Sequence, residues 1–561
     1  MSRKRWIVLF FLLLAVCFFI ADRGAYKGYF QDDDLDNLAF TRELPLSSFL
    51  VPLVYPRVYP NNFRPVGHLF YRVMGQTAGL NYIPYIVFLH VLHLANVLLL
   101  WLILKRLGLA DLAAGGGALF FAFHMALFDV FWMPMYVFDL LCGFFCLLSV
   151  LAYLDGRWIL SLGAMFVAYR AKEVAIMLPV VLAAYEFLSG QKRPRRLIPF
   201  FALSLTIGTQ AIVQNHSRGD TDYTLHIDPA SVWKCIQFYS GRVFLIPYAG
   251  LLVLLLLLVV RDRRFLFGAA GFCALLAPML LLPGRLFSPY LYVPLLSLSI
   301  AVAALAARQT PLVAALFFAV WLPWNYVNLR WERRTILADA RDRQTFTREL
   351  TAFNRDHPNL AAYVYGAAPV NAYATHAVVK LAHPPGAALR FVTLEDADLP
   401  NVLASKAVAV VSWDQTRRHL RTIVRSPQTT DTSYLKMSDD TPIWQLGPGW
   451  YPLEQSFRWT QPYATAHLTR PENATEFELV VNISPQYLEK IPRNHVTLTL
   501  NGTTLGDHEF SSPGWQTVRW VLPAAPPGPV EVGIHVTPEF YANRRLGIAV
   551  GGLGFVLHNT L

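Results

Sequence analysis

The sequence predicts a polytopic α-helical membrane protein of about eleven spans, followed by an exported region with an α/β unit and a β-sandwich. Two observations lead to this fold class. The 561 residues are 55% hydrophobic and only 15% charged, a balance far too apolar for an ordinary soluble protein. Long apolar windows fill the first 330 residues, whereas short strand-like runs with turn signals begin near residue 361.

Eleven apolar windows have lengths near those of membrane spans. The basic stretch Arg3-Lys4-Arg5 before the first window resembles the start of a signal peptide. No small-residue cleavage site follows it, so we expect a retained signal anchor. The windows lie near residues 6–22, 83–104, 112–131, 137–154, 158–171, 173–189, 197–213, 242–260, 265–282, 290–307 and 311–328.

Basic residues between the windows predict how the chain is oriented in the membrane. Six clusters fall in alternate loops, and all six are cytoplasmic if the N-terminus is cytoplasmic. We therefore expect a multi-pass protein of the inner membrane, with the region after about residue 329 in the periplasm or otherwise extracytoplasmic. The net charge of +11 is dispersed over these loops, which argues against a nucleic-acid partner. The clusters are Arg3-Lys4-Arg5, Lys105-Arg106, Arg157, Lys192 to Arg196, Arg261 to Arg264, and Arg308.

A cluster of four carboxylates follows directly on the first window, in a long outer loop over residues 23–82. It consists of Asp32, Asp33, Asp34 and Asp36. Like charges a few ångströms apart raise one another's pKa, so such a cluster usually holds a metal, moves a proton or meets a cation. A solvated acidic loop that caps a helix is the alternative. The loop is longer than structureless loops usually are, and we expect short helices within it along the outer face.

The exported region is expected to have two parts. Residues 331–430 begin with a charged amphipathic helix over 331–356 and continue as a small α/β unit, with strands over 361–365, 389–393 and 407–412 and a helix near 414–424. Residues 431–561 are expected to form a β-sandwich that binds carbohydrate. Its strands are predicted over 477–481, 496–500, 517–522 and 530–536, with Asn501-Gly502 as a hairpin turn.

Several motifs follow one another in the first 330 residues. After the acidic cluster come Asn62 to Leu69, Leu119 to His124 with Asp129, Trp132 and Asp139, Lys172-Glu173 with Pro179 and Glu186, and Ser288 to Pro294. In this order and spacing the chain resembles the GT-C superfamily, the integral-membrane glycosyltransferases that use lipid-linked sugars. The likeness is closest to the transmembrane O-mannosyltransferases with tetratricopeptide repeats and to their bacterial relatives, although the repeats are absent here.

The resemblance implies an enzyme that moves a sugar from a polyprenyl-phosphate donor to an exported glycan, lipid or protein. Such a transfer needs a base for the acceptor hydroxyl, and the family places its catalytic Asp in the loop of the acidic cluster. We expect Asp33 or Asp34 to be the base, with Asp32 and Asp36 as neighbours. Asp33 and Asp34 would also suit a divalent cation such as Mg²⁺ or Mn²⁺, but many relatives with monosaccharyl phosphate donors require no cofactor.

The donor phosphate calls for Arg or Lys at the outer membrane face. Arg170, Lys172 and Arg285 are predicted there, and an ion pair with Glu173 is the alternative for the first two. Arg64 either pairs with the acidic cluster or contacts the donor. The residues expected to line the substrate are His68, His124, Asp129, Tyr136, Glu173, Tyr290 and Tyr292.

A second class of function remains open, namely a transporter or flippase of a lipid-linked glycan with an exported binding domain. Such proteins show inverted repeats and charged or broken helices near the bilayer midplane. In this sequence the ionisable residues concentrate at the outer ends of the windows, and no repeat is seen. The sequence therefore favours the enzyme.

Overall fold

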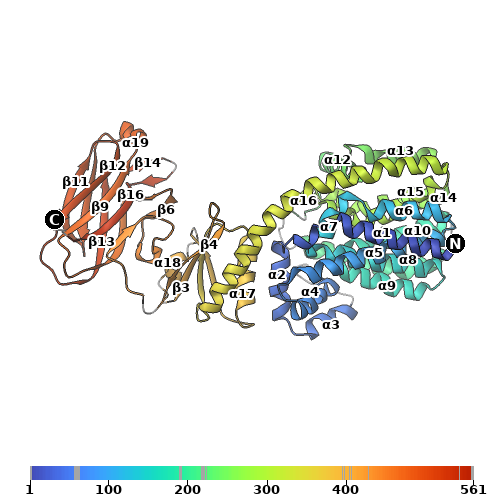
Figure 1. Ribbon diagram of the computed structural model, residues 1–561, viewed down its shortest axis with the longest axis horizontal. Coiled ribbons are helices and arrows are strands. Elements are labelled where there is room, and N and C mark those ends of the chain that lie inside the picture. Colours follow the sequence, from blue (N-terminus) through green and yellow to red (C-terminus); the bar gives the residue numbers. More distant parts are fainter. Residues whose placement is uncertain are drawn as a thin grey trace. The chain divides into compact units, whose positions relative to one another are not determined.

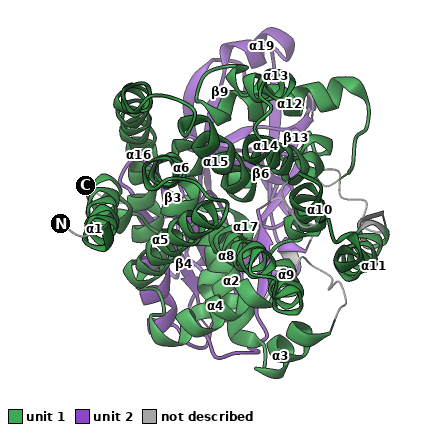
Figure 2. Cartoon of the chain, turned by 90° about the vertical axis from the view of Figure 1, so that its right-hand side faces the viewer, with its two compact units in different colours: residues 1–347, 369–381 green, residues 348–368, 382–561 purple. Residues whose placement is uncertain are grey.

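The structure is a computed structural model that describes residues 3–55, 63–188, 192–216, 222, 224–394, 396, 398–403, 405, 407–426, 429–542 and 544–557. The chain divides into two compact units, which Figure 2 distinguishes by colour. Unit 1 comprises Met1–Thr347 and Pro369–Leu381, and unit 2 comprises Arg348–Ala368 and Ala382–Leu561.

Unit 1 is helical (Figure 1). Its longer helices are α1 (Arg3–Ala21), α5 (Tyr82–Arg106), α8 (Val137–Leu154), α11 (Ile198–His216), α12 (Pro229–Val243), α14 (Arg263–Leu276), α15 (Tyr292–Ala306) and α16 (Pro311–Asp356), the last of which ends in unit 2. Its shorter helices are α2 (Asp32–Glu43), α3 (Ser47–Val54), α4 (Pro65–Thr77), α6 (Asp111–Ala122), α7 (Phe128–Trp132), α9 (Trp158–Ala171), α10 (Leu178–Leu188), α13 (Leu252–Val259) and α17 (Ala372–Ala382).

The apolar helices make unit 1 a multi-pass membrane protein. Among the described residues, six helices are long and apolar enough to cross a membrane, or seven if α6 and Met125–Trp132 form one span bent by 44°. The expected count of eleven is not reached by this measure, because some windows form short helices and others are broken. Helix α9 has only 14 residues, and Tyr248 has a left-handed backbone that interrupts the window over 242–260.

Burial separates the middle of the helical unit from its periphery. Figure 2 shows α5, α6, α8 and α15 in the middle, with α1, α11 and α16 towards the outside. The apolar stretch of α15 is 78% buried, whereas that of α16 is 17% buried. Gly268 permits one close contact in the middle, since a Cβ there would lie 2.4 Å from the backbone nitrogen of Ala301. The exposed apolar side chains of the outer helices are those expected to face lipid.

The long outer loop contains the short helices that the sequence predicted. Its residues form α2, α3 and α4 within the described part of the loop. Arg72 of α4 donates to the carbonyls of Thr41 and Arg42 at 3.1 and 2.7 Å. These carbonyls belong to the last turn of α2 and lack intrahelical partners, so the guanidinium fixes the end of α2 against α4.

The first part of unit 2 contains a four-stranded sheet in the order β2-β1-β3-β4. Strands β1 (Ala362–Tyr365), β2 (Arg390–Thr393) and β3 (Val408–Asp414) are parallel and confirm three predicted strands. The helix predicted near 414–424 is wrong, because β4 (His419–Arg425) pairs antiparallel with β3. Asp414 accepts the N–H groups of Thr416 and Arg417 and so forms the turn that reverses the chain. The short helix α18 (Leu399–Leu403) precedes β3.

The rest of unit 2 is a β-sandwich, as predicted. One sheet has the order β11-β10-β13-β8 and the other β12-β9-β16-β7-β6, with β5 also paired to β16. The inward side chains of both sheets form one core, which includes Phe477, Leu498 and Ile534. The strands are β5 (Tyr434–Lys436), β6 (Trp450–Glu454), β7 (Phe457–Thr460), β8 (Tyr463–Arg470), β9 (Glu476–Ile483), β10 (Asn494–Leu500), β11 (Thr503–Phe510), β12 (Gly514–Val521), β13 (Gly528–Thr537), β14 (Phe540–Tyr541), β15 (Arg545–Leu546) and β16 (Ala549–Val556), with helix α19 (Pro485–Lys490) after β9.

Candidate functional site

The acidic cluster forms the first turn of α2, and Asp34 is its structural member. Asp34 accepts the backbone N–H of Gln31 at 2.7 Å, which completes a capping box. Its other carboxylate oxygen accepts the hydroxyl of Tyr71 in α4 at 2.6 Å. The side chain is completely buried, and this burial raises the pKa of Asp34 to about 7. Asp34 thus holds α2 against α4, with both oxygens engaged.

Asp33 and Asp32 are the accessible members of the cluster. Asp33 is exposed, and its Oδ1 accepts the hydroxyl of Tyr373 at 2.6 Å. Asp32 is half-buried, and its Oδ1 accepts the backbone N–H of Asn371 at 3.1 Å. Both partners stand at the start of α17, which belongs to unit 1 (Figure 2). Neither partner could be predicted from local sequence patterns, because Tyr373 lies 340 positions from Asp33.

A buried ion pair lies at the break after α9. Lys172 Nζ donates to both carboxylate oxygens of Asp139, each at 2.6 Å, and both side chains are almost completely buried. The same nitrogen lies 4.6 Å from the centroid of the Tyr290 ring, within the range of a cation–π contact. The ion-pair partner of Lys172 at hydrogen-bond distance is therefore Asp139, while the charge of Lys172 also acts on Glu173.

Glu173 instead pairs with Arg64. Arg64 Nε donates to Glu173 Oε1 at 2.8 Å, a carboxylate outside the acidic cluster. One turn further along α4, His68 directs Nδ1 at the backbone N and O of Arg64, at 3.0 and 2.9 Å. Burial lowers the pKa of His68 to about 4. His68 is thus neutral at physiological pH and stabilises the start of α4.

Tyr136 connects the acidic cluster with the buried ion pair. It ends the 3₁₀ helix Pro134–Tyr136, and the preceding residue, Met135, donates its backbone N–H to Asp34. The groups that act electrostatically on its hydroxyl are Asp129, Asp139, Tyr290 and Asp33. Asp33 and the Lys172–Asp139 pair therefore share one neighbourhood around this phenol.

Arg285 lies in the segment that precedes Tyr290. Its guanidinium is 5.2 Å from the centroid of the Phe287 ring, and its carbonyl accepts the hydroxyl of Tyr239 at 3.3 Å. Tyr239 lies close enough to Tyr290 to interact with it electrostatically.

Three other predicted residues serve the packing of the helices. His124 contacts the carbonyl of Val243 at 2.8 Å and accepts the N–H of Ala126 at 3.2 Å. The hydroxyl of Tyr292 accepts from Asn96 at 2.9 Å. The third residue, Arg170, is buried with its guanidinium over the rings of Phe166 and Tyr169.

Asp129 lies in α7 and acts electrostatically on the hydroxyl of Tyr136. It is half-buried, and the charges of Glu332 and Arg242 act on it. Its predicted place beside the substrate remains a prediction.

A divalent cation at Asp33 and Asp34 remains a prediction. Asp34 uses both oxygens in hydrogen bonds, and Asp33 shares one with Tyr373. Among the residues that the structure describes, no three His, Cys, Asp or Glu side chains are grouped as metal ligands.

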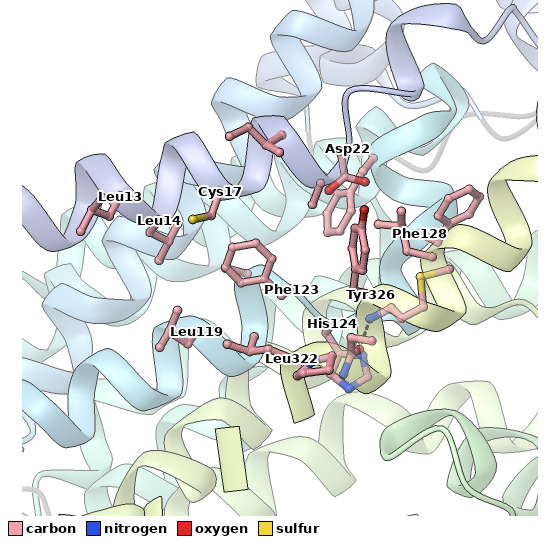
Figure 3. Close-up of a pocket in the computed structure, with 18 of the residues that line it drawn as sticks. Leu13, Leu14, Cys17, Asp22, Leu119, Phe123, His124, Phe128, Leu322 and Tyr326 are labelled. Atoms are coloured by element: carbon pink, nitrogen blue, oxygen red, sulfur yellow. Dashed lines mark hydrogen bonds between the residues drawn. The ribbon is translucent and has the colours of Figure 1, made fainter. Parts of the chain in front are cut away.

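A separate apolar cavity of about 520 Å³ lies between α1, α6, α7 and α16 (Figure 3). Its walls include Leu14, Phe123, Phe128 and Leu322. One buried carboxylate, Asp22, also lines it, and this carboxylate accepts the indole N–H of Trp132 at 2.9 Å. The acidic cluster and the Lys172–Asp139 pair do not line this cavity.

No protein-family model and no curated protein matches the chain. Among solved structures, ArnT from Cupriavidus metallidurans bound to undecaprenyl phosphate is similar over 76% of this chain and 99% of its own, at 14% identity and a TM-score of 0.46. Arabinofuranosyltransferase AftD from Mycobacteria is similar over 100% of this chain and 59% of its own, at 11% identity and a TM-score of 0.38. Arabinosyltransferase EmbB from Mycobacterium smegmatis is similar over 99% of this chain and 66% of its own, at 11% identity and a TM-score of 0.36.

Proposed function

We propose that this protein is a membrane glycosyltransferase that moves a sugar from a polyprenyl-phosphate donor to an exported glycan, lipid or protein at the outer face of the inner membrane. The observation that carries the proposal is the exposed carboxylate of Asp33 in one neighbourhood with the Lys172–Asp139 pair, around Tyr136. A base close to a cation suits transfer from a phosphate leaving group. The order of the sequence motifs, which resembles the GT-C superfamily, supports the same function.

In the proposed reaction Asp33 is the base. The acceptor hydroxyl oxygen attacks the anomeric carbon of the donor and forms the new glycosidic bond. The bond from that carbon to the phosphate oxygen breaks, and its electron pair leaves with the lipid phosphate. The hydroxyl proton passes to the Asp33 carboxylate. We prefer Asp33 to Asp34 because Asp34 is buried with both oxygens engaged.

Lys172 is the proposed partner of the leaving phosphate. An ammonium group has three N–H donors, and two of them are directed at Asp139. The third is left for a phosphate oxygen, while Asp139 keeps the charged group in place inside the protein. Arg64 and Arg285 are the other proposed phosphate-binding residues. A guanidinium is well suited to hold two phosphate oxygens at once.

We propose that the reaction requires no metal, since both oxygens of Asp34 are engaged in hydrogen bonds. Turnover is expected to survive EDTA and to be unchanged by added Mg²⁺ or Mn²⁺. Activity that EDTA removes and Mn²⁺ restores would contradict this part of the proposal.

The β-sandwich of unit 2 is the proposed binding module for the acceptor glycan. Four residues form a row across neighbouring strands of one sheet. In the order of the strands β12, β9, β16 and β7 they are Trp515, Asn482, Ala549 and Trp459. Directly opposed residues of neighbouring strands project from the same face of a sheet. The ring of Phe457 lies 6.4 Å from that of Trp515 and 6.2 Å from that of Trp459. Aromatic rings beside an amide are groups on which a sugar can stack and hydrogen-bond.

The proposed orientation places the N-terminus in the cytoplasm and unit 2 outside. Tags inserted at Ala110 and Arg263 are expected to report the cytoplasm, and a tag at Trp450 the exterior. A cytoplasmic signal from Trp450 would remove the sandwich from the side where the acceptor is exported.

The transferase itself is tested with purified protein and a panel of labelled polyprenyl-phosphate sugars. Asp33→Asn is expected to lower turnover by about 10²- to 10⁴-fold and to leave donor binding intact. Asp36→Asn is the matched control, because it removes another exposed carboxylate of α2. Wild-type turnover in Asp33→Asn would refute Asp33 as the base. Movement of a donor across vesicles without any glycosylated product would indicate a transporter instead.

A further inference from the structure

Helix α17 is docked against α2 at both of its ends. It is the connection between the parallel strands β1 and β2, yet residues 369–381 belong to unit 1. At its N-terminal end, Asn371 and Tyr373 donate to Asp32 and Asp33. At its C-terminal end, Arg42 Nη1 donates to the carbonyl of Leu381 at 2.6 Å.

The charges of α2 complement the dipole of α17. Asp32 and Asp33 lie at the helix end that carries partial positive charge, and Arg42 lies at the end that carries partial negative charge. Asn371 also caps α17, since its side-chain oxygen accepts the N–H of Ala374 at 3.0 Å. Because α2 supplies a partner at each end, α17 lies beside it in one register, and the position of Tyr373 relative to Asp33 is defined.

The contact of Tyr373 with Asp33 has the length of a charge-assisted bond. Hydroxyl donors approach carboxylates to about 2.5–2.7 Å when the acceptor is ionised, and this distance is 2.6 Å. The bond occupies Oδ1. Within the described part of the chain, Oδ2 of Asp33 has no hydrogen-bond partner, so the same bond that orients the carboxylate leaves one oxygen for another hydroxyl.

We infer that Tyr373 is a positioning residue of the transfer site. Its hydroxyl holds Oδ1 of Asp33 and thereby directs Oδ2 at the hydroxyl of the acceptor. The inference rests on the proposed role of Asp33 as the base. It assigns a part of the site to a segment that lies between two strands of the α/β sheet, far along the chain from the acidic cluster.

The test is Tyr373→Phe, which removes only the hydroxyl oxygen. The Tyr373 side chain is 44% exposed, so the variant is expected to keep the fold. We expect kcat to fall by about 10- to 100-fold, the effect of one charge-assisted hydrogen bond, with an unchanged KM for the donor. Arg42→Gln is the control, because it weakens the docking of α17 at the opposite end without touching Asp33, and its kcat is expected to change much less.

A double variant separates positioning from a general effect on structure. In an Asp33→Asn background, Tyr373→Phe is expected to cause no further loss, because Tyr373 acts through Asp33. Wild-type kcat in Tyr373→Phe, together with an impaired Asp33→Asn, would overturn the inference and leave the proposed function intact. A higher kcat in Tyr373→Phe would also overturn it and would make α17 an inhibitory cover. Wild-type turnover in Asp33→Asn would refute the proposed function itself.

Discussion

Replacement of Asp34 by Asn is expected to change how the stability of the protein depends on pH. Burial raises the pKa of Asp34 to about 7 in the folded protein, while an unfolded Asp has a pKa of about 3.9. The folded state therefore favours the protonated carboxyl. Stability that is present below about pH 4 is lost as the pH rises through about 7. With about 1.4 kcal/mol for each pH unit between the two values, the loss amounts to about 4 kcal/mol.

Asp34→Asn removes this ionisation. The amide has one acceptor oxygen where the carboxyl group accepts at both, from the backbone N–H of Gln31 and the hydroxyl of Tyr71, so the variant is expected to be less stable than wild type at about pH 4. The wild-type protein then loses about 3 to 4 kcal/mol between about pH 4 and pH 8, and the variant does not. The difference between the two should therefore shrink, or change sign, as the pH rises.

The assay is unfolding in detergent, followed by tryptophan fluorescence over a series of pH values. Tyr71→Phe serves as the matched control. The Tyr71 hydroxyl lowers the pKa of Asp34 by donating to it, so its removal should raise that pKa further and steepen the loss of stability. Parallel pH profiles for wild type and Asp34→Asn would show that Asp34 does not change its charge on unfolding in this range and would refute the reasoning.

Three further predictions concern the ion pair, the donor and the acceptor. Lys172→Met leaves Asp139 buried without its partner and should lower stability by about 3–5 kcal/mol, and the double variant with Asp139→Asn should recover most of this in the same unfolding assay. Arg285→Ala should weaken donor binding by about 10- to 100-fold, and Arg285→Lys by less, as measured with a fluorescent donor; wild-type affinity in the Ala variant would assign Arg285 to structure. Trp515→Ala should weaken glycan binding to the full-length protein by about 10-fold or more and leave donor binding unchanged, and equal glycan affinity would exclude this face as the binding surface.

Much of the fold follows from local patterns. The runs around Phe477 and Val496 alternate apolar and polar residues with the period of a strand, and they form β9 and β10 as predicted. The pattern failed near residue 414, where the turn at Asp414 and pairing with β3 made β4 a strand. The count of spans also differed, because hydropathy does not show that Tyr248 has a left-handed backbone within the window over 242–260.

For the candidate site, the sequence predicted only the residue types and their approximate positions. An acidic cluster after an apolar window, and Arg and Lys at the outer ends of later windows, can be read from residue type and position. The sequence does not predict which charged groups form pairs. Lys172 is followed by Glu173 in the chain, but its ammonium group donates to Asp139 in the folded protein. Residues that lie far apart in sequence meet through helix packing, and no local pattern encodes those contacts.

The sequence by itself determined that this is a membrane protein with a β-rich C-terminal region and an acidic cluster after its first apolar window, because hydropathy and period depend on neighbouring residues alone. The tertiary structure decided that Asp34 is a buried cap and Asp33 an exposed carboxylate. Three consecutive aspartates on a helix point in different directions, so their roles depend on what packs against each side. Tyr71 of α4 covers Asp34, and Tyr373 of α17 reaches Asp33.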